Sequence, residues 1–265
     1  GVYAALGEGA AAGNRVEITG TGTDARLKVT DPGGVATEFS PIAYTAGTAT
    51  EWAPLSVTEP GSVGATSFSR DAQGRIIRIL APVPDGVTCA AAGSPLMAGC
   101  RALHIDYATA TTATSSVPGD IAGQVEAIWF DAFNPAKAGG AGMDSVMVAD
   151  YAYNSSKQLV RATDSRAGRS TSYEYSGSSG SGAPLLTRVI PAGKAGYTLA
   201  YGQASQDSSS LLTVSRDNPA GSGAAVQLSR FVYGIDPTQA NGQFCDRGPQ
   251  YRSAIFPRND TEKRQ

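Results

Sequence analysis

The sequence predicts an all-β protein built as a repetitive antiparallel sheet, and three observations carry that prediction. Short runs alternate apolar and polar residues, which is the period of a strand with one buried face. Turn-forming residues are abundant, with 32 Gly and 15 Pro among 265 residues. A tyrosine pattern recurs along the chain, whereas convincing helical periodicity is absent before the last few residues.

Strands and turns are predicted in alternation along the chain. The clearest strand runs are residues 15–19, 26–30, 75–80 and 124–130. The clearest turns are residues 31–34, 71–74 and 217–219. Residues 71–74 place an Asp at the first position and a Gly at the fourth, which a type I turn followed by a left-handed residue prefers.

Paired tyrosines mark the clearest repeat, which runs from Tyr151 and Tyr153 to Tyr173 and Tyr175. Residues two apart in a strand point to the same face, so each pair predicts an aromatic rung on one side of the sheet. Packing within the sheet is the favoured interpretation of these rungs. Carbohydrate is the alternative partner, because flat aromatic faces also stack on sugar rings.

Two segments carry a family resemblance, residues 151–164 and residues 68–79. Both look like the Tyr-Asp-x-x-Gly-Arg-Leu repeat of YD-repeat (Rhs-type) proteins, and the likeness extends over residues 15–235. The resemblance implies a wide β-sheet shell, which in some members closes around a toxin cargo. The implied partners are other segments of the same YD-repeat protein or its cargo.

The chain departs from the repeat pattern at several positions. Asn154 and Ser176 stand where the family has Asp, and residues 85–100 and 131–146 interrupt the period. The self-cleaving segment and the toxin domain of the family are not present in these residues. We therefore expect a piece of shell wall and not the toxic cargo.

From Ile235 onward the sequence resembles another family, the type A peptide methionine sulfoxide reductases. The likeness rests on the run Asp246-Arg247-Gly248-Pro249-Gln250-Tyr251-Arg252-Ser253-Ala254-Ile255-Phe256. We therefore divide the chain into a YD-repeat region, residues 1–234, and a partial reductase-like segment, residues 235–265. The join near Ile235 is either natural or a product of gene assembly, and the sequence leaves both origins open.

The reductase resemblance implies a cysteine nucleophile in a Gly-Cys-Phe-Trp motif, which no cysteine of this chain occupies. Two partners of the sulfoxide oxygen carry over, Asp246 and Tyr251, although a turn residue and a strand aromatic are the plainer interpretations. Cys245 beside Arg247 is a surrogate nucleophile, with a free thiol as its alternative. No bound cofactor is expected, and a thiol reductant such as thioredoxin would serve the reductase.

The remaining cysteines, Cys89 and Cys100, bracket a loop of small residues. They are a disulfide candidate in an oxidising compartment, with a pair of inert thiols as the alternative. The chain has one histidine, His104, and no Cys-x-x-Cys motif, so a zinc site is not expected. His104 and Asp106 would share one strand face, and a satisfied strand histidine is the favoured interpretation.

The bulk charge and hydropathy limit the partners further. The chain has 21 Lys and Arg against 23 Asp and Glu, which gives a net charge of -2. This balance lacks the excess of basic residues that binds the phosphates of nucleic acids, so nucleic acid is not an expected partner. No apolar run is long enough to span a bilayer.

Two hypotheses follow from the two resemblances. The first is a secreted or cell-surface structural fragment that acts in toxin encapsulation or cell contact and is not catalytic as it stands. The second is a truncated cytoplasmic peptide-methionine (S)-S-oxide reductase.

Overall fold

The computed structural model describes residues 2–4, 12–45, 48–137, 142–176, 184–202, 210–218, 223–232 and 254–257. Within these ranges the chain is almost entirely antiparallel β-structure, and the single helical element is the short 3-10 helix η1, Gly22–Asp24. The predicted all-β, repetitive sheet is therefore confirmed.

The chain divides into two compact units. The first comprises Gly1–Ala110 and Ala122–Asp150, and the second comprises Thr111–Ile121 and Tyr151–Gln265. The predicted boundary near Ile235 lies outside the described residues.

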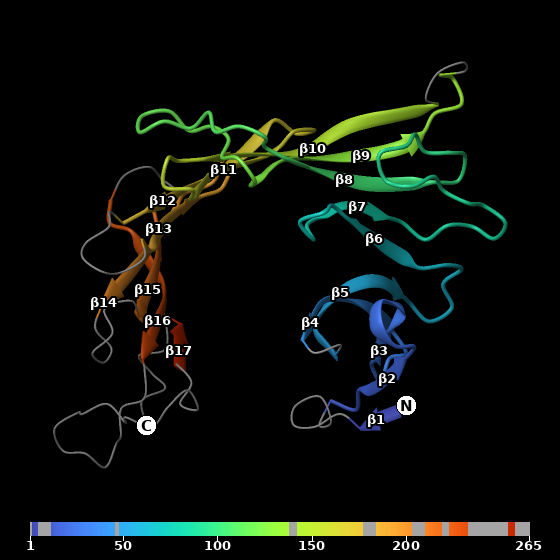
Figure 1. The fold of residues 1–265 in the computed structure, drawn as a ribbon. Helices are drawn as coiled ribbons and strands as arrows, with labels where there is room; N and C mark the ends of the chain where they lie inside the picture. The colour runs from blue at the N-terminus through green and yellow to red at the C-terminus, as the bar shows by residue number, and fades with distance from the viewer. Residues whose placement is uncertain are drawn as a thin grey trace, which may run out of the picture. The chain divides into compact units, whose positions relative to one another are not determined.

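The first unit holds nine complete strands and most of a tenth (Figure 1). They are β1 (Val2–Ala4), β2 (Arg15–Thr19), β3 (Arg26–Thr30), β4 (Ala36–Thr45), β5 (Thr48–Thr58), β6 (Thr66–Arg70), β7 (Ile76–Leu80), β8 (Arg101–Tyr107), β9 (Val125–Phe133) and β10 (Met143–Tyr153). Each strand pairs antiparallel with the next along the chain. The unit is thus a meander, in which short turns join several of the strands and longer segments join β7 to β8 and β8 to β9.

The second unit repeats the same plan. Its strands after β10 are β11 (Leu159–Asp164), β12 (Arg169–Tyr175), β13 (Leu186–Ile190), β14 (Tyr197–Gly202), β15 (Ser210–Arg216), β16 (Val226–Val232) and β17 (Ala254–Pro257). Sequential antiparallel pairing runs from β11 to β17. One row of paired residues crosses three of its strands, with Val189 between two tyrosines, because Tyr173 pairs with Val189 and Val189 pairs with Tyr197.

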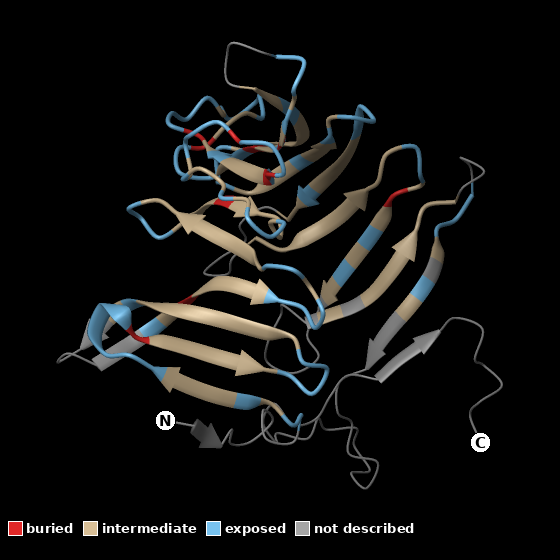
Figure 2. Ribbon diagram, turned by 90° about the vertical axis from the view of Figure 1, so that its right-hand side faces the viewer, coloured by how far each residue is buried: buried red, intermediate tan, exposed pale blue. Residues whose placement is uncertain are grey.

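Most described strand residues are half-buried, and fully buried positions are few (Figure 2). One buried cluster, in the first unit, joins Leu96 and Cys100 of the loop between β7 and β8 to Ala102 of β8. Leu80, Val87, Cys89 and Met143 pack against that cluster. The loop therefore serves as a local cover for one face of the sheet.

The turn between β6 and β7 shows why the repeat needs its polar residues. The Oδ1 atom of Asp71 accepts hydrogen bonds from the backbone N–H groups of Gln73 at 3.0 Å and Arg75 at 2.9 Å. Arg75 Nε lies 2.7 Å from Asp71 Oδ2. Gly74 has φ +78°, a left-handed conformation that favours glycine. Asp, Gly and Arg at this spacing thus build one closed turn.

The same turn recurs elsewhere with different residues. Asp31 Oδ1 accepts from Val35 N at 2.9 Å, before β4. In the second unit, Asn154 Oδ1 accepts from Gln158 N at 3.0 Å, and Asn154 Nδ2 donates to Gln158 Oε1 at 2.7 Å. Lys157 takes the left-handed position there, with φ +65°. A neutral Asn–Gln pair therefore replaces the charged Asp–Arg pair.

A tyrosine from the following strand completes two of these turns. In the first unit the Tyr107 hydroxyl donates to the carbonyl of Ile76, the first residue of β7, at 3.0 Å. In the second unit the Tyr175 hydroxyl donates to the carbonyl of Leu159, the first residue of β11, at 2.9 Å. The structural repeat thus couples a turn to the strand beyond it.

Candidate functional site

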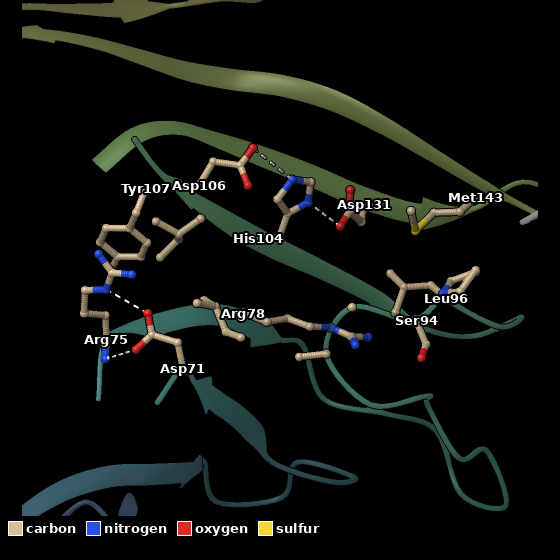
Figure 3. Close-up of a pocket in the computed structure, with 15 residues that line it drawn as sticks. Asp71, Arg75, Arg78, Ser94, Leu96, His104, Asp106, Tyr107, Asp131 and Met143 are labelled. Carbon is tan, nitrogen blue, oxygen red and sulfur yellow. Dashed lines mark hydrogen bonds and ion pairs between the residues drawn. The ribbon is translucent and has the colours of Figure 1, made fainter. Parts of the chain in front are cut away.

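The first unit contains a pocket of about 490 Å³ beside strands β7, β8 and β9 (Figure 3). Its charged and polar lining includes Arg78, His104, Asp106 and Asp131. Residues 92–96 of the loop between β7 and β8 line the pocket too. Its volume lies within the range of about 300–1,000 Å³ that small-molecule pockets occupy.

Strand register brings these side chains to one face. Arg78 of β7 pairs with His104 of β8, and His104 pairs with Trp129 of β9. Next to that row, Asp131 of β9 pairs with Ser145 of β10. Directly opposed residues of an antiparallel pair share a face, so two polar rows lie side by side.

His104 is held between two carboxylates. Its Nδ1 donates to Asp131 Oδ2 at 2.6 Å, and its Nε2 lies 3.7 Å from Asp106 Oδ2. The imidazole stacks on Trp129 with a centroid separation of 5.8 Å. The expected sharing of one face by His104 and Asp106 is therefore observed, and the closer partner is Asp131.

Ser145 completes this cluster from β10. Its hydroxyl donates to Asp131 Oδ1 at 2.6 Å, so each oxygen of that buried carboxylate accepts one hydrogen bond. In a serine hydrolase the serine hydroxyl bonds to the histidine, whereas here it bonds to the aspartate. The cluster of Ser145, Asp131 and His104 is thus a positioned polar network and not a nucleophilic triad.

Arg78 is the buried cation of the pocket, with a relative exposure of 5%. Its Nη1 donates to the carbonyl of Ala90 in the covering loop at 2.9 Å. Its Nη2 has no hydrogen-bond partner. Burial lowers the pKa of the Arg78 guanidinium, and the negative charge of Asp131 acts in the opposite direction.

The turn between β6 and β7 forms another wall of the pocket. The Arg75 guanidinium lies over the Tyr107 ring, with Cζ 4.2 Å from the ring centroid, while its Nε bonds Asp71. Desolvation raises the pKa of Asp71, but hydrogen bonds from the Arg75 backbone and side chain outweigh it, so that the pKa is lowered. Asp71 and Arg75 thus neutralise each other at this wall.

A disulfide closes the covering loop. Cys89 and Cys100, the two cysteines paired in the sequence analysis, are bonded with a Cα–Cα distance of 5.8 Å. Cys100 is buried with Leu96, and the bond therefore ties the loop to the start of β8. Because Ala90 lies inside the closed loop, the disulfide also holds the carbonyl that Arg78 uses.

The sequence also raised the questions of a metal site, of a reductase-like site and of a membrane span. Across the described part of the chain, no group of three or more His, Cys, Asp or Glu residues is arranged to hold a metal ion. The reductase-like candidates Cys245, Asp246 and Tyr251 lie outside the described residues. In that same described part, no helix has the length and apolar character needed to cross a membrane.

Comparison with known proteins concerns the carboxyl-terminal segment. The family model of peptide methionine sulfoxide reductase matches residues 223–265. Peptide methionine sulfoxide reductase MsrA of Bacillus subtilis (strain 168) is 58% identical over 36 residues, which are 14% of this chain and 20% of that protein. The corresponding protein of Bacillus velezensis is 62% identical over 29 residues, 11% of this chain and 16% of its own length.

The carboxyl-terminal segment is therefore similar to these reductases, as the sequence predicts. The chain spans about a fifth or less of the length of the curated relatives it matches. The matched residues include β16 and the short strand β17, which pair with each other.

The sequence did not predict that Arg78 is buried beside the pocket or that His104 bonds Asp131. One signal was available, because Arg78 interrupts an otherwise apolar strand at a position that alternation does not require to be polar. The pairing with Asp131 depends on strand register across 27 residues, which the linear sequence does not display.

Proposed function

We propose that this chain is a structural and interaction segment of a YD-repeat (Rhs-type) shell, which contributes to toxin encapsulation or cell-surface contact. The recurring turns at Asp31, Asp71 and Asn154 support the repeat assignment, since in each the first side chain accepts a hydrogen bond from the backbone N–H four residues later, and the Asp71 turn does so with the Asp-x-x-Gly-Arg residues. The completing tyrosines Tyr107 and Tyr175 support it in the same way.

The single observation that carries the interaction role is an apolar row across one sheet face. Phe68 of β6 pairs with Ile79 of β7, Ile79 with Leu103 of β8, Leu103 with Phe130 of β9, and Phe130 with Val146 of β10. Phe130 and Val146 are 39% and 49% exposed. Contiguous apolar residues exposed to solvent are typical of contact surfaces.

The disulfide supports a secreted or cell-surface location for this shell segment. Structural disulfides persist in oxidising compartments and are rare in the cytosol. The proposed partners are accordingly other segments of the same protein or its cargo, which would cover the apolar row.

Binding of an unfolded polypeptide probe tests the interaction role. We expect a reduced, alkylated protein to bind the chain, and we expect Phe130→Asp with Val146→Asp to weaken that binding about tenfold or more because a charge enters the row. Val63→Asp is the matched control, since Val63 is 56% exposed in a turn outside the row. Equal binding by both variants, or none by the native chain, would reject the proposal.

A second candidate is the thiol-dependent peptide-methionine (S)-S-oxide reductase, which the match over residues 223–265 favours. In this hypothesis Cys245 replaces the missing nucleophile, and Asp246 and Tyr251 hold the sulfoxide oxygen. The test is methionine sulfoxide reduction with a thiol reductant by the native chain and by Cys245→Ser. Turnover that disappears in the variant would establish the enzyme, whereas no turnover in either would eliminate it.

A further inference from the structure

The covering loop, residues 81–100 between β7 and β8, has few attachments to the sheet (Figure 1). Most of residues 91–99 are exposed, and Leu96 is the one buried residue among them. Leu96 packs in a cluster with Cys100 and Ala102. A single apolar side chain therefore anchors this stretch to the sheet.

Hydrogen bonds add little to that anchor. Within the described chain, the bond from Arg78 Nη1 to the Ala90 carbonyl at 2.9 Å is the one that joins residues 90–99 to the sheet. The backbone bonds of this stretch close turns within the loop itself. The loop thus lacks the ladder of hydrogen bonds that holds a strand in place.

Closure of the loop is also unfavourable for Arg78, whose guanidinium lies beside it (Figure 3). Arg78 Nη2 is buried without a hydrogen-bond acceptor. If the loop moved away, water would bond both nitrogens of this charged group, whereas the closed loop supplies an acceptor for one. The burial of Arg78 therefore favours an open loop.

The disulfide supplies the constraint that these contacts lack. Cys89 and Cys100 are 11 positions apart, and their bond closes residues 90–99 into a ring. A closed ring has fewer open conformations than a free segment of the same length. Because Cys100 is buried beside Leu96, the bond also keeps Leu96 near its cluster. The closed position of the loop thus depends on the covalent bond.

We propose that the covering loop is a redox latch, which its disulfide keeps closed and a dithiol reductant opens. A thiolate of the reductant attacks the sulfur of the half-buried Cys89, so the Cys89–Cys100 bond breaks and Cys100 takes up a proton. The second thiolate of the reductant then displaces Cys89. The chain gains two electrons and two protons, and the reductant becomes a disulfide.

The open latch uncovers the guanidinium of Arg78 and the apolar side chains of Leu80 and Met143, which pack against the loop. Such a latch is closed in an oxidising compartment and opens in a reducing one. It does not depend on the shell role, because the apolar row from Phe68 to Val146 contains no residue of the loop.

Arginine labelling of the full chain tests the proposal. We expect phenylglyoxal to label Arg78 about tenfold or more faster in the double variant Cys89→Ala with Cys100→Ala than in the native chain, because Arg78 is 5% exposed under the closed loop. Arg166, whose side chain is 69% exposed, is the internal control and should be labelled equally in both proteins. Equal protection of Arg78 in the two proteins would overturn the proposal.

Thiol alkylation tests the reduction step in the native chain. After treatment with dithiothreitol and its removal, a pulse of iodoacetamide should alkylate Cys100 at about the same rate as Cys89, because the open loop exposes both thiols. Cys100 is 4% exposed in the closed loop. A Cys100 that stays protected after reduction would overturn the proposal, as would a bond that dithiothreitol leaves intact in the folded chain.

Hydrogen exchange separates an open latch from an unfolded unit. The backbone amides of β2 and β3 should keep their native protection in the reduced chain, because the latch opens locally. Loss of that protection on reduction would show that the whole unit unfolds, and it would overturn the assignment of a latch.

Discussion

His104 of β8 donates its Nδ1–H to Asp131 of β9 at 2.6 Å, a hydrogen bond between residues 27 positions apart in the chain. Because Asp131 is only 6% exposed, the bond stabilises a carboxylate that would otherwise be poorly solvated. It links two neighbouring strands beneath the disulfide-closed loop, and it gives the first prediction.

We expect His104→Phe to lower the free energy of unfolding by about 1–3 kcal/mol, since the buried Asp131 loses one of its two donors. Phenylalanine keeps an aromatic ring against Trp129. Urea unfolding at neutral pH measures the change. Asp106→Asn is the control, because that exposed pair at 3.7 Å should contribute at most about 1 kcal/mol. An equal loss in both variants would contradict the assignment of Asp131 as the main partner.

Tyr107→Phe and Tyr175→Phe are each expected to cost about 0.5–1.5 kcal/mol, because each removes a hydroxyl that donates to a strand carbonyl. Thermal unfolding of the two single variants measures this. Tyr151→Phe, which changes the first tyrosine of a repeat pair, is the control. It should lower the free energy of unfolding by less than either test variant does. Unchanged stability in both test variants would show that these hydroxyls do not maintain the repeat.

The stability contributed by Asp71 should depend on pH. Its folded pKa is lowered, so the contribution is present above the unfolded value of about 3.9 and is lost as the pH falls through the lowered folded value. Asp71→Asn keeps the side-chain oxygen that accepts from the turn backbone, as Asn154 does in the second unit. We therefore expect the variant to be less stable than the native chain at pH 6 and equally stable at strongly acidic pH. A difference that stays constant across a pH series of urea titrations would refute the coupling to ionisation.

Removal of the disulfide should lower stability by about 3 kcal/mol, because the bond restricts the unfolded chain across a short loop. The double variant Cys89→Ala with Cys100→Ala is compared with the native chain by urea unfolding, with and without dithiothreitol. The reductant should destabilise the native chain alone, since the double variant has no such bond to reduce. A similar effect of dithiothreitol on both proteins would show that the reductant does not destabilise the native chain through the Cys89–Cys100 bond.

Much of the fold follows from local sequence. Residues 15–19 and 26–30 were predicted as strands and form β2 and β3 with those bounds, because alternation and flanking turn residues act within a few positions. The strand predicted at 124–130 continues to Phe133 in β9. Alternation would end the strand at the polar residue Asp131. The strand continues because Asp131 accepts hydrogen bonds from His104 of β8 and Ser145 of β10, the two neighbouring strands.

The sequence by itself determined the all-β class, the turns at residues 31–34 and 71–74 and the likeness of the final segment to the reductases, since each depends on residues close together in the chain. Tertiary structure alone decided which polar residues meet. Arg78, His104, Asp131 and Ser145 share one face only through the register of four strands, and a shift by one residue would turn them to the other face. The pocket is therefore a property of the paired strands and of the disulfide-closed loop that covers them.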